Sequence, residues 1–316
     1  MKKAFEKLNL RDYGVLLGFL ALCIAISIAT PSFLGKQNIL NLLRQSSIIG
    51  IISAGMTFVI ISGNFDISVG AVAALAGAIT MKFATGGTNL FASMLLGVAI
   101  CAVIGLINGI VVAKINVPSL IATMAMVTIV RGLLLMLTGG YPITENIPIL
   151  DYIGNGYLFS IPIPVVIFFI VVLASFIVLN KTKFGRYVYS VGGNQEASKL
   201  NGINVDSHKV KVFIINAVLA GIAGIVLTGR LGTATAIAGE GYDMDAIASV
   251  VIGGTSVAGG SGSVLKTVIG VLLMSVINNS FNLLGIDVYF QYIFKGLIIL
   301  AAVGFDYYSK KKLASR

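Results

Sequence analysis

Residues 192–203 read Gly-Gly-Asn-Gln-Glu-Ala-Ser-Lys-Leu-Asn-Gly-Ile, and they separate two long apolar stretches. Asn194 can cap a short helix, Glu196 suits the positive end of the helix dipole, and Gly202 can end the helix in the left-handed conformation. Six basic residues surround this segment: Lys181, Lys183, Arg186, Lys199, Lys209 and Lys211. A capped, basic helix between apolar segments favours a docking surface for a soluble partner, with a solvated connecting loop as the alternative.

The composition is that of an integral membrane protein. The chain has 316 residues, of which 57% are hydrophobic and 11% are charged, and its mean hydropathy is +0.98. Soluble domains carry about 25% charged residues. The apolar runs reach the ~20 residues that a helix needs to cross a bilayer, and they lack sustained alternation. We therefore predict an all-α integral membrane protein, with residues 1–316 forming a single transmembrane domain.

Ten apolar segments are long enough to be candidate spans, the eighth being short and interrupted by Gly253-Gly254. With the N-terminus inside, an even number of spans returns the C-terminus inside, and 16 of the 22 basic residues then lie on the inner side, as membrane orientation favours. The inner segments are residues 1–12, the 181–211 loop and the basic tail 309–316. The predicted spans are 13–30, 46–62, 67–83, 91–113, 117–138, 162–180, 212–230, 243–256, 263–280 and 291–308.

Some basic residues do not fit this orientation, among them Arg131 and Lys295, which fall inside or beside apolar segments. Residues 36–45 form a polar stretch that we expect at the outer interface, and they include the exceptions Lys36 and Arg44. The net charge of +10 comes from loops and termini, so nucleic acid is not an expected partner.

A weak internal repeat links the two halves of the chain. Phe65-Asp66-Ile67-Ser68 resembles Tyr242-Asp243-Met244-Asp245, and Gly97-Val98 with Val103-Ile104 matches Gly270-Val271 with Val276-Ile277 at the same internal spacing. An offset of five crossings reverses direction in the membrane, so these matches predict inverted halves, a feature of transport proteins.

Signals for catalysis are poor. The single histidine, His208, lies in the charged loop and is expected to be a solvated surface residue. The chain has no GxxxxGK[ST] phosphate loop, and Cys23 and Cys101 lie in apolar spans where packing is the expected role. The Gly-rich run 253–262 is interpreted as a tight turn between spans, with re-entrant backbone as the second choice. We expect no catalytic residue, no metal site and no cofactor.

Polar residues within the spans are the candidates for a pathway or for gating, because they are costly in a bilayer. Asp66 is the main candidate, with capping of the third span as an equally supported role. Asn278, Asn279 and Asn282 lie along the ninth span, where they can line a hydrated cavity or join helices by hydrogen bonds. Arg131 is expected to seek carbonyls or a carboxylate. The full set of predicted pathway or gating residues is Asn64, Phe65, Asp66, Ser68, Asn278, Asn279 and Asn282.

Four ordered blocks together resemble the permease subunits of bacterial ABC sugar importers, the ribose/xylose/galactose type. They are Ser62-Gly-Asn-Phe-Asp-Ile-Ser-Val-Gly70, Gly193-Asn194-x-x-Ala197 with Gly202-Ile203, Ala238-Gly-Glu-Gly-Tyr-Asp-Met-Asp-Ala-Ile-Ala248, and Gly253-Gly-Thr-Ser with Gly259-Gly-Ser-Gly262. The resemblance covers nearly the whole chain. Small departures at Ser62, Asn64, Ser198 and Asn201 leave the identity of the sugar open.

The resemblance implies a fold similar to type II ABC importer permeases and a role as the translocation subunit for ribose or a similar pentose in the bacterial cytoplasmic (inner) membrane. Its implied partners are a separate ATP-binding-cassette ATPase, a periplasmic or lipid-anchored sugar-binding protein, a second permease copy in a homodimer, and membrane lipid. Residues 192–203 would be the coupling helix. The residues expected to couple to the ATPase are Gly193, Asn194, Glu196, Ala197, Lys199, Leu200, Gly202 and Ile203.

Two other classes are weighed against this one. An ion-driven secondary transporter would use Asp66 as its ion site and would need no ATPase. An integral membrane enzyme would need a converging set of His, Cys or acidic groups, which the sequence does not show.

Overall fold

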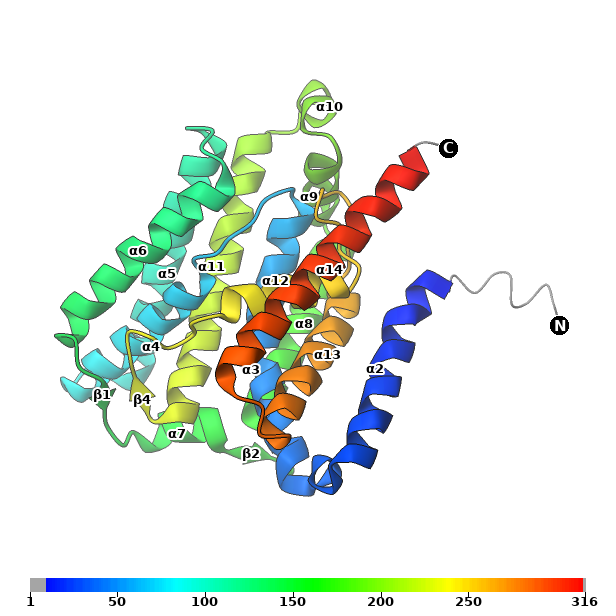
Figure 1. Cartoon of the computed structure of the whole chain (residues 1–316). Coiled ribbons are helices and arrows are strands. Elements are labelled where there is room, and N and C mark those ends of the chain that lie inside the picture. Colours follow the sequence, from blue (N-terminus) through cyan, green and yellow to red (C-terminus); the bar gives the residue numbers. More distant parts are fainter. Residues whose placement is uncertain (1–9, 315–316) are drawn as a thin grey trace.

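The computed structural model describes residues 10–314, with side-chain surroundings given for residues 17–304, and this region is mainly helical (Figure 1). A helix lies at each of the ten predicted spans. These helices are α2 (Leu10–Ala29), α3 (Lys36–Ile61), α4 (Val69–Thr85), α5 (Leu90–Ala113), α6 (Ser119–Thr138), α8 (Ile163–Lys181), α11 (Val205–Leu231), α12 (Tyr242–Ile252), α13 (Val264–Leu283) and α14 (Val288–Ala314).

The helices differ in their ability to cross a membrane. Of the residues described, six helices are long and apolar enough to span a bilayer, and α2, α4 and α14 contribute shorter apolar stretches. The eighth predicted span is confirmed as short, because α12 has only 11 residues. Residues 36–45, which we expect at the outer interface, are helical and continuous with the predicted span 46–62. They form the first turns of α3, where packing buries Leu42 and Arg44.

The remaining elements lie at the two ends of the bundle. At one end, α9 (Lys183–Gly193) and α10 (Gln195–Leu200) project from it, and the last part of α14 lies at this end too (Figure 1). The opposite end carries the 3-10 helix η1 (Pro31–Leu34), α7 (Pro148–Asn155) and two small antiparallel ladders. These pair β1 (Ile143–Thr144) with β4 (Thr233–Ala234) and β2 (Tyr157–Leu158) with β3 (Ile161–Pro162).

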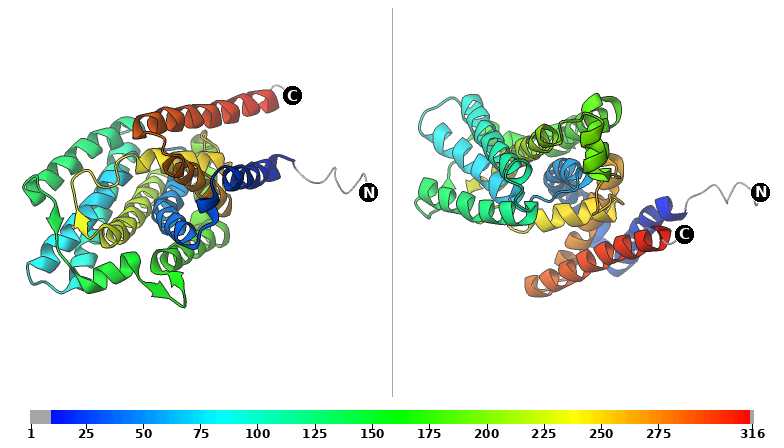
Figure 2. Two further views of the ribbon diagram at one scale, coloured as in Figure 1. Left: turned by 60° about the horizontal axis from the view of Figure 1, so that its bottom comes forward. Right: turned by 90° about the horizontal axis from the view of Figure 1, so that it is seen from above.

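The core forms around two helices, α3 and α11, which the other helices surround. The apolar part of α3 is 94% buried, and Figure 2 shows this helix near the centre of the bundle when seen along its length. α3 packs on α8, α12 and α13, and α11 packs on α4 and α5. Each central helix therefore packs against a helix pair from the other half of the chain. Small residues permit close approach: a Cβ at Gly224 in α11 would lie 1.8 Å from the carbonyl oxygen of Ala73 in α4.

The two halves are inverted, as predicted. α4 and α12 begin side by side, since Gly70 and Gly239 pack backbone to backbone. From there α4 runs toward β1 and α7, while α12 runs toward the projecting end (Figure 1). A Cβ at Gly97 would meet the carbonyl oxygen of Ala76 at 2.8 Å, and a Cβ at Gly270 would meet that of Ser249 at 2.0 Å.

These two contacts are equivalent and set the register of the repeat. Adding 173 to the residue numbers of the first pair gives the second pair, and the same shift takes Val69, which begins α4, to Tyr242, which begins α12. The predicted match around Gly97 and Gly270 is therefore correct. The match of Asp66 with Asp243 needs a shift of 177, so it is wrong by four residues, about one helical turn.

Candidate functional site

The projecting segment, residues 183–203, is called the knob below. Asn194 caps α10, its Oδ1 accepting a hydrogen bond from the Ala197 amide at 2.9 Å. Gly202 takes the left-handed conformation with φ of +76°, and the amide of Ile203 donates to the carbonyl of Ser198 at 3.0 Å. The local start and stop signals of this helix are confirmed.

The knob buries one side of α10 and exposes the other. Ser198 is buried, and its hydroxyl lies 2.9 Å from that of Ser190 in α9. Leu200 is 89% exposed. Glu196 and Lys199 form an exposed pair at 3.6 Å. Of the eight predicted coupling residues, those on the exposed side are Gly193, Asn194, Glu196, Ala197, Lys199, Leu200 and Gly202, with Ile203 half-buried.

The knob is braced against α11 by residues outside the predicted set. His208 stacks on Phe184 with ring centroids 5.7 Å apart and meets Tyr187 edge-on at 5.1 Å. Lys209 donates to the side chain of Gln195 at 2.9 Å. His208 is thus half-buried and packed against two aromatic rings of the knob, not simply a solvated surface residue.

A polar network surrounds Asp66 in the non-helical segment 62–68, between α3 and α4. The Asp66 carboxylate accepts from the Ser68 amide at 2.9 Å, the Ser68 hydroxyl at 2.5 Å and the Asn216 side chain at 2.9 Å. Asn108 in α5 donates to the Ser68 hydroxyl at 3.0 Å. All four residues are at least 99% buried. Asp66 therefore ties α5, α11 and the start of α4 together through neutral donors.

The backbone of this segment also needs partners, because lipid supplies none. The amide of Phe65 donates to the Ser119 hydroxyl at 3.1 Å, and the amide of Ile67 donates to the Thr123 hydroxyl at 3.2 Å. Asn64 donates from its side chain to the carbonyl and the hydroxyl of Ser62, both at 3.1 Å. Non-helical chain within the bundle is thus satisfied from α6 and from its own residues.

A second non-helical segment, residues 235–241 before α12, is held by Arg131 of α6. The Arg131 guanidinium donates to the carbonyl of Ala236 and, at 3.1 Å, to that of Ala238. This confirms the expectation that Arg131 seeks carbonyls. It also explains why a cation lies inside an apolar span.

A second acidic residue, Asp245 in α12, forms an ion pair. Its carboxylate oxygens lie 3.0 and 3.1 Å from Nζ of Lys295 in α14. Asn278 donates to Asp245 at 3.5 Å, and its own Oδ1 is buried without a hydrogen-bond partner among the described residues. The pair accounts for Lys295, which did not fit the charge distribution. Sequence reasoning missed Asp245, although its motif YDMD had been singled out.

The three asparagines of α13 have three separate partners. Asn279 exchanges hydrogen bonds with Asn38 of α3 at 2.8 and 3.0 Å. Asn282 accepts from Gln291 of α14 at 3.2 Å, and Asn278 reaches Asp245 in α12. These contacts agree with the interhelical role that was one of the two readings of these side chains.

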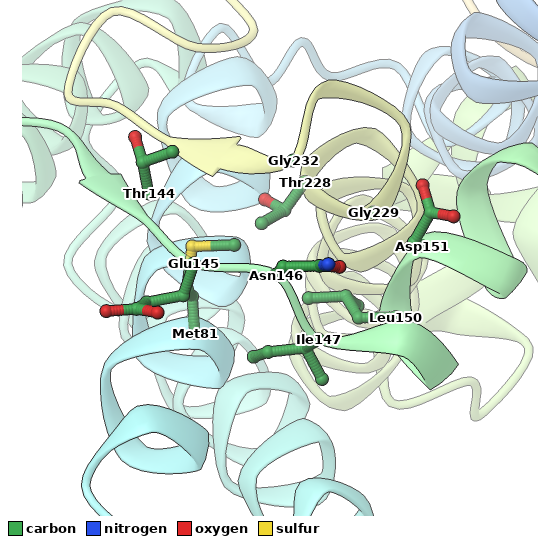
Figure 3. A pocket seen from close by; sticks show the side chains of 10 residues that line it. All are labelled: Met81, Thr144, Glu145, Asn146, Ile147, Leu150, Asp151, Thr228, Gly229 and Gly232. Atoms are coloured by element: carbon green, nitrogen blue, oxygen red, sulfur yellow. The ribbon is translucent and has the colours of Figure 1, made fainter.

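A pocket of about 240 Å³ lies at the end opposite the knob, between α4, α7, α11 and the segment after β1 (Figure 3). Figure 3 shows the carboxylates of Glu145 and Asp151 on two sides of it. Thr228 and Met81 contribute buried walls. None of the seven predicted pathway residues lines this pocket, whose lining is Met81, Thr144, Glu145, Asn146, Ile147, Leu150, Asp151, Thr228, Gly229 and Gly232.

Comparison with known proteins finds close relatives along almost the whole chain. The ribose import permease of Haemophilus influenzae is 44% identical over 303 residues, which cover 93% of this chain and 94% of the relative. That of Bacillus subtilis is 43% identical, covering 94% and 93%. The L-arabinose transport system permease of Escherichia coli is 35% identical, covering 95% and 92%. No solved structure was found to match.

A family model also matches, over residues 38–303. The matched region begins in α3 and ends in α14, so it contains the knob, both non-helical segments and the two buried acidic residues. The chain belongs to the permease family described as branched-chain amino acid transport system / permease component.

Proposed function

We propose that this chain is the translocation subunit of an ATP-binding-cassette importer that carries ribose or a similar pentose into the cell. The observation that carries the mechanism is the knob, an exposed capped helix standing on one end of a helical bundle. The relatives that support the substrate are named for ribose and L-arabinose, both five-carbon sugars.

The knob faces the cytoplasm in this proposal, together with both termini, in a bacterial inner membrane. The basic residues around it support that orientation, because cytoplasmic loops carry an excess of Lys and Arg. The ATPase then binds the exposed side of α10, where Leu200 supplies an apolar contact and Glu196 and Lys199 supply charges. All eight predicted coupling residues are proposed to act here: Gly193, Asn194, Glu196, Ala197, Lys199, Leu200, Gly202 and Ile203.

The opposite end faces the outside and receives sugar from a periplasmic or lipid-anchored binding protein. A second copy of this chain completes the pathway, with residues 1–316 acting as one permease domain. Within each copy, we assign Asn64, Phe65, Asp66 and Ser68, together with Asn278, Asn279 and Asn282, to gating. Two of these contacts, Asp66 with Asn216 and Asn279 with Asn38, join helices of the two inverted halves. A change in the relative position of those halves must rearrange these hydrogen bonds.

The Asp66 geometry favours this mechanism over an ion-driven one. Both carboxylate oxygens already accept hydrogen bonds from neutral donors, and the side chain is 99% buried. A sodium ion would have to compete with those donors for the carboxylate oxygens. No second function is proposed.

The test is uptake of labelled ribose into proteoliposomes that contain the permease, its ATPase and its binding protein. We expect uptake to require ATP and to fall at least about tenfold in Leu200→Arg and Glu196→Arg, since a buried mismatched charge at an interface commonly costs that much. The ATPase should also co-purify less with these variants. Uptake and assembly that both match the wild type would refute the docking assignment, and uptake by the permease alone with an ion gradient would refute the transport class.

A further inference from the structure

Three glycine-containing segments meet where the knob joins the bundle. They are the end of α3 with Gly63, the end of α9 at Gly192, and the turn 259–262 between α12 and α13. A Cβ at Gly192 would lie 1.7 Å from the carbonyl oxygen of Ile61 and 2.8 Å from the amide nitrogen of Gly260. The three segments are thus in direct backbone contact, and this contact is called the glycine junction below.

The carbonyl of Ile61 is the centre of the glycine junction. Ile61 is the last residue of α3, so no later residue of the helix supplies the usual hydrogen bond to its carbonyl. The amide of Gly260 supplies it at 2.8 Å. Gly259 and Gly260 take left-handed conformations, with φ of +83° and +73°, which glycine adopts without the strain that other residues incur.

A side chain strengthens the same link. The Tyr189 hydroxyl, from α9, donates to the carbonyl of Gly262 at 3.0 Å. Burial raises the pKa of Tyr189, so the hydroxyl keeps its proton and remains a donor. The knob is therefore joined to the α12–α13 turn by one hydrogen bond and to α3 by close backbone packing.

The positions of these contacts matter because α3 leads into the Asp66 segment and the turn follows α12, which carries Asp245. A segment of each inverted half thus lies at the base of the knob. Gly193, one residue further along, is not packed in this way, since a Cβ there would come no closer than 3.9 Å to Gly260.

We infer that Gly192 is a positioning residue for coupled transport: by having no side chain, it keeps the knob in backbone contact with α3 and with the α12–α13 turn, so that displacement of the knob moves both halves. The inference rests on the proposed function. A methyl group at position 192 must push the knob base away from Ile61 by roughly 1.5 Å to restore normal contact. The exposed side of α10 remains free to bind the ATPase.

The experiment measures ATP hydrolysis and ribose uptake together in proteoliposomes that hold the complete complex, for the wild type and for Gly192→Ala. We expect Gly192→Ala to assemble and to hydrolyse ATP, while the amount of ribose moved per ATP falls about tenfold, within the usual range of coupling between sites. A purely structural role would lower assembly and both rates in parallel. Gly193→Ala should show a smaller loss.

Two further variants make the result decisive. Gly132→Ala is the control, because a Cβ at Gly132 in α6 meets nothing within 4 Å. The amount of ribose that this variant moves per ATP should match that of the wild type. Tyr189→Phe removes only the hydrogen bond to Gly262 and should lower the ratio about twofold to fivefold.

An unchanged ratio in Gly192→Ala overturns the inference. Where Gly192→Ala does not assemble, an unchanged ratio in Tyr189→Phe overturns it instead. A wild-type complex without ATP-driven ribose uptake would refute the proposed function itself, which is a separate and recognisable result.

Discussion

The two inverted halves each bury an acidic residue near the start of a short helix, but they satisfy it differently. Asp66, before α4, receives neutral donors from Ser68 and Asn216. Asp245, in α12, pairs with the ammonium of Lys295. The donors to Asp66 come from the buried centre of the bundle, whereas Lys295 comes from α14, a peripheral helix, and its side chain is 23% exposed.

This difference indicates which of the two buried networks costs more free energy to open. The Asp66 network includes a backbone amide and joins α4, α5 and α11, so it cannot open without leaving several buried polar groups unpaired. The Asp245 pair depends on one flexible side chain. Water can reach it as α14 shifts, which lowers the cost of separating the charges. We therefore expect the Asp245–Lys295 pair to open more readily than the Asp66 network when the two halves move.

The largest effect is predicted for Asp66→Ala. The change removes the acceptor for the Ser68 amide, the Ser68 hydroxyl and the Asn216 side chain, all in a dry site. We expect the free energy of unfolding, measured by SDS titration, to fall on the order of 4 kcal/mol or more. Adding Asn216→Leu should not rescue it, because the Ser68 amide stays unpaired. Recovery of wild-type stability in that double variant would contradict the account of this half.

A smaller loss is predicted for Lys295→Met, which leaves the Asp245 carboxylate buried without its cation. The free energy of unfolding should fall by about 2 kcal/mol, less than for a fully buried pair because Lys295 is partly exposed. Here the double variant Asp245→Leu/Lys295→Met should regain most of the loss, since an apolar pair can replace a buried ion pair. If the double variant is as unstable as Lys295→Met, the two halves do not differ as proposed.

The smallest of these effects concerns the packing of the repeat. Gly270→Ala places a methyl group 2.0 Å from the carbonyl oxygen of Ser249, and Gly97→Ala places one 2.8 Å from that of Ala76. We expect losses of about 1.5 kcal/mol for Gly270→Ala and about 1 kcal/mol for Gly97→Ala, as for other overpacked sites. Thermal unfolding of the purified variants shows which of them loses more stability. A larger loss for Gly97→Ala than for Gly270→Ala would contradict the packing described here.

Features that depend on nearby residues could be predicted from the sequence. The ten apolar segments predicted the helices, because hydropathy and length decide what can cross a membrane. The Asn194 cap and the Gly202 stop predicted α10, because both act within one turn of the helix. The matched glycines of the repeat predicted the inverted halves, although the Asp66 motif was placed one turn out of register.

Features that depend on distant partners could not be predicted. Asp66 and Asn216 are 150 residues apart, and Asp245 and Lys295 are 50 apart, so only the packing of the helices brings them together. The start of α3 lies ten residues before the predicted span 46–62 for the same reason. The partners of Arg44 there are also distant in sequence: its guanidinium lies 4.8 Å from the Tyr157 ring and donates to the Asn155 carbonyl at 3.3 Å.

The most direct test of the central claim is cysteine cross-linking of the complete complex in native membranes. Leu200→Cys places a thiol on the exposed knob, and Phe159→Cys places one at the opposite end, where Phe159 is 92% exposed. Cys23→Ser removes the partly exposed native thiol from both variants. The account predicts a cross-link to the ATPase from position 200 and none from position 159. A cross-link from position 159, or none from position 200 in a complex that transports ribose, would contradict it.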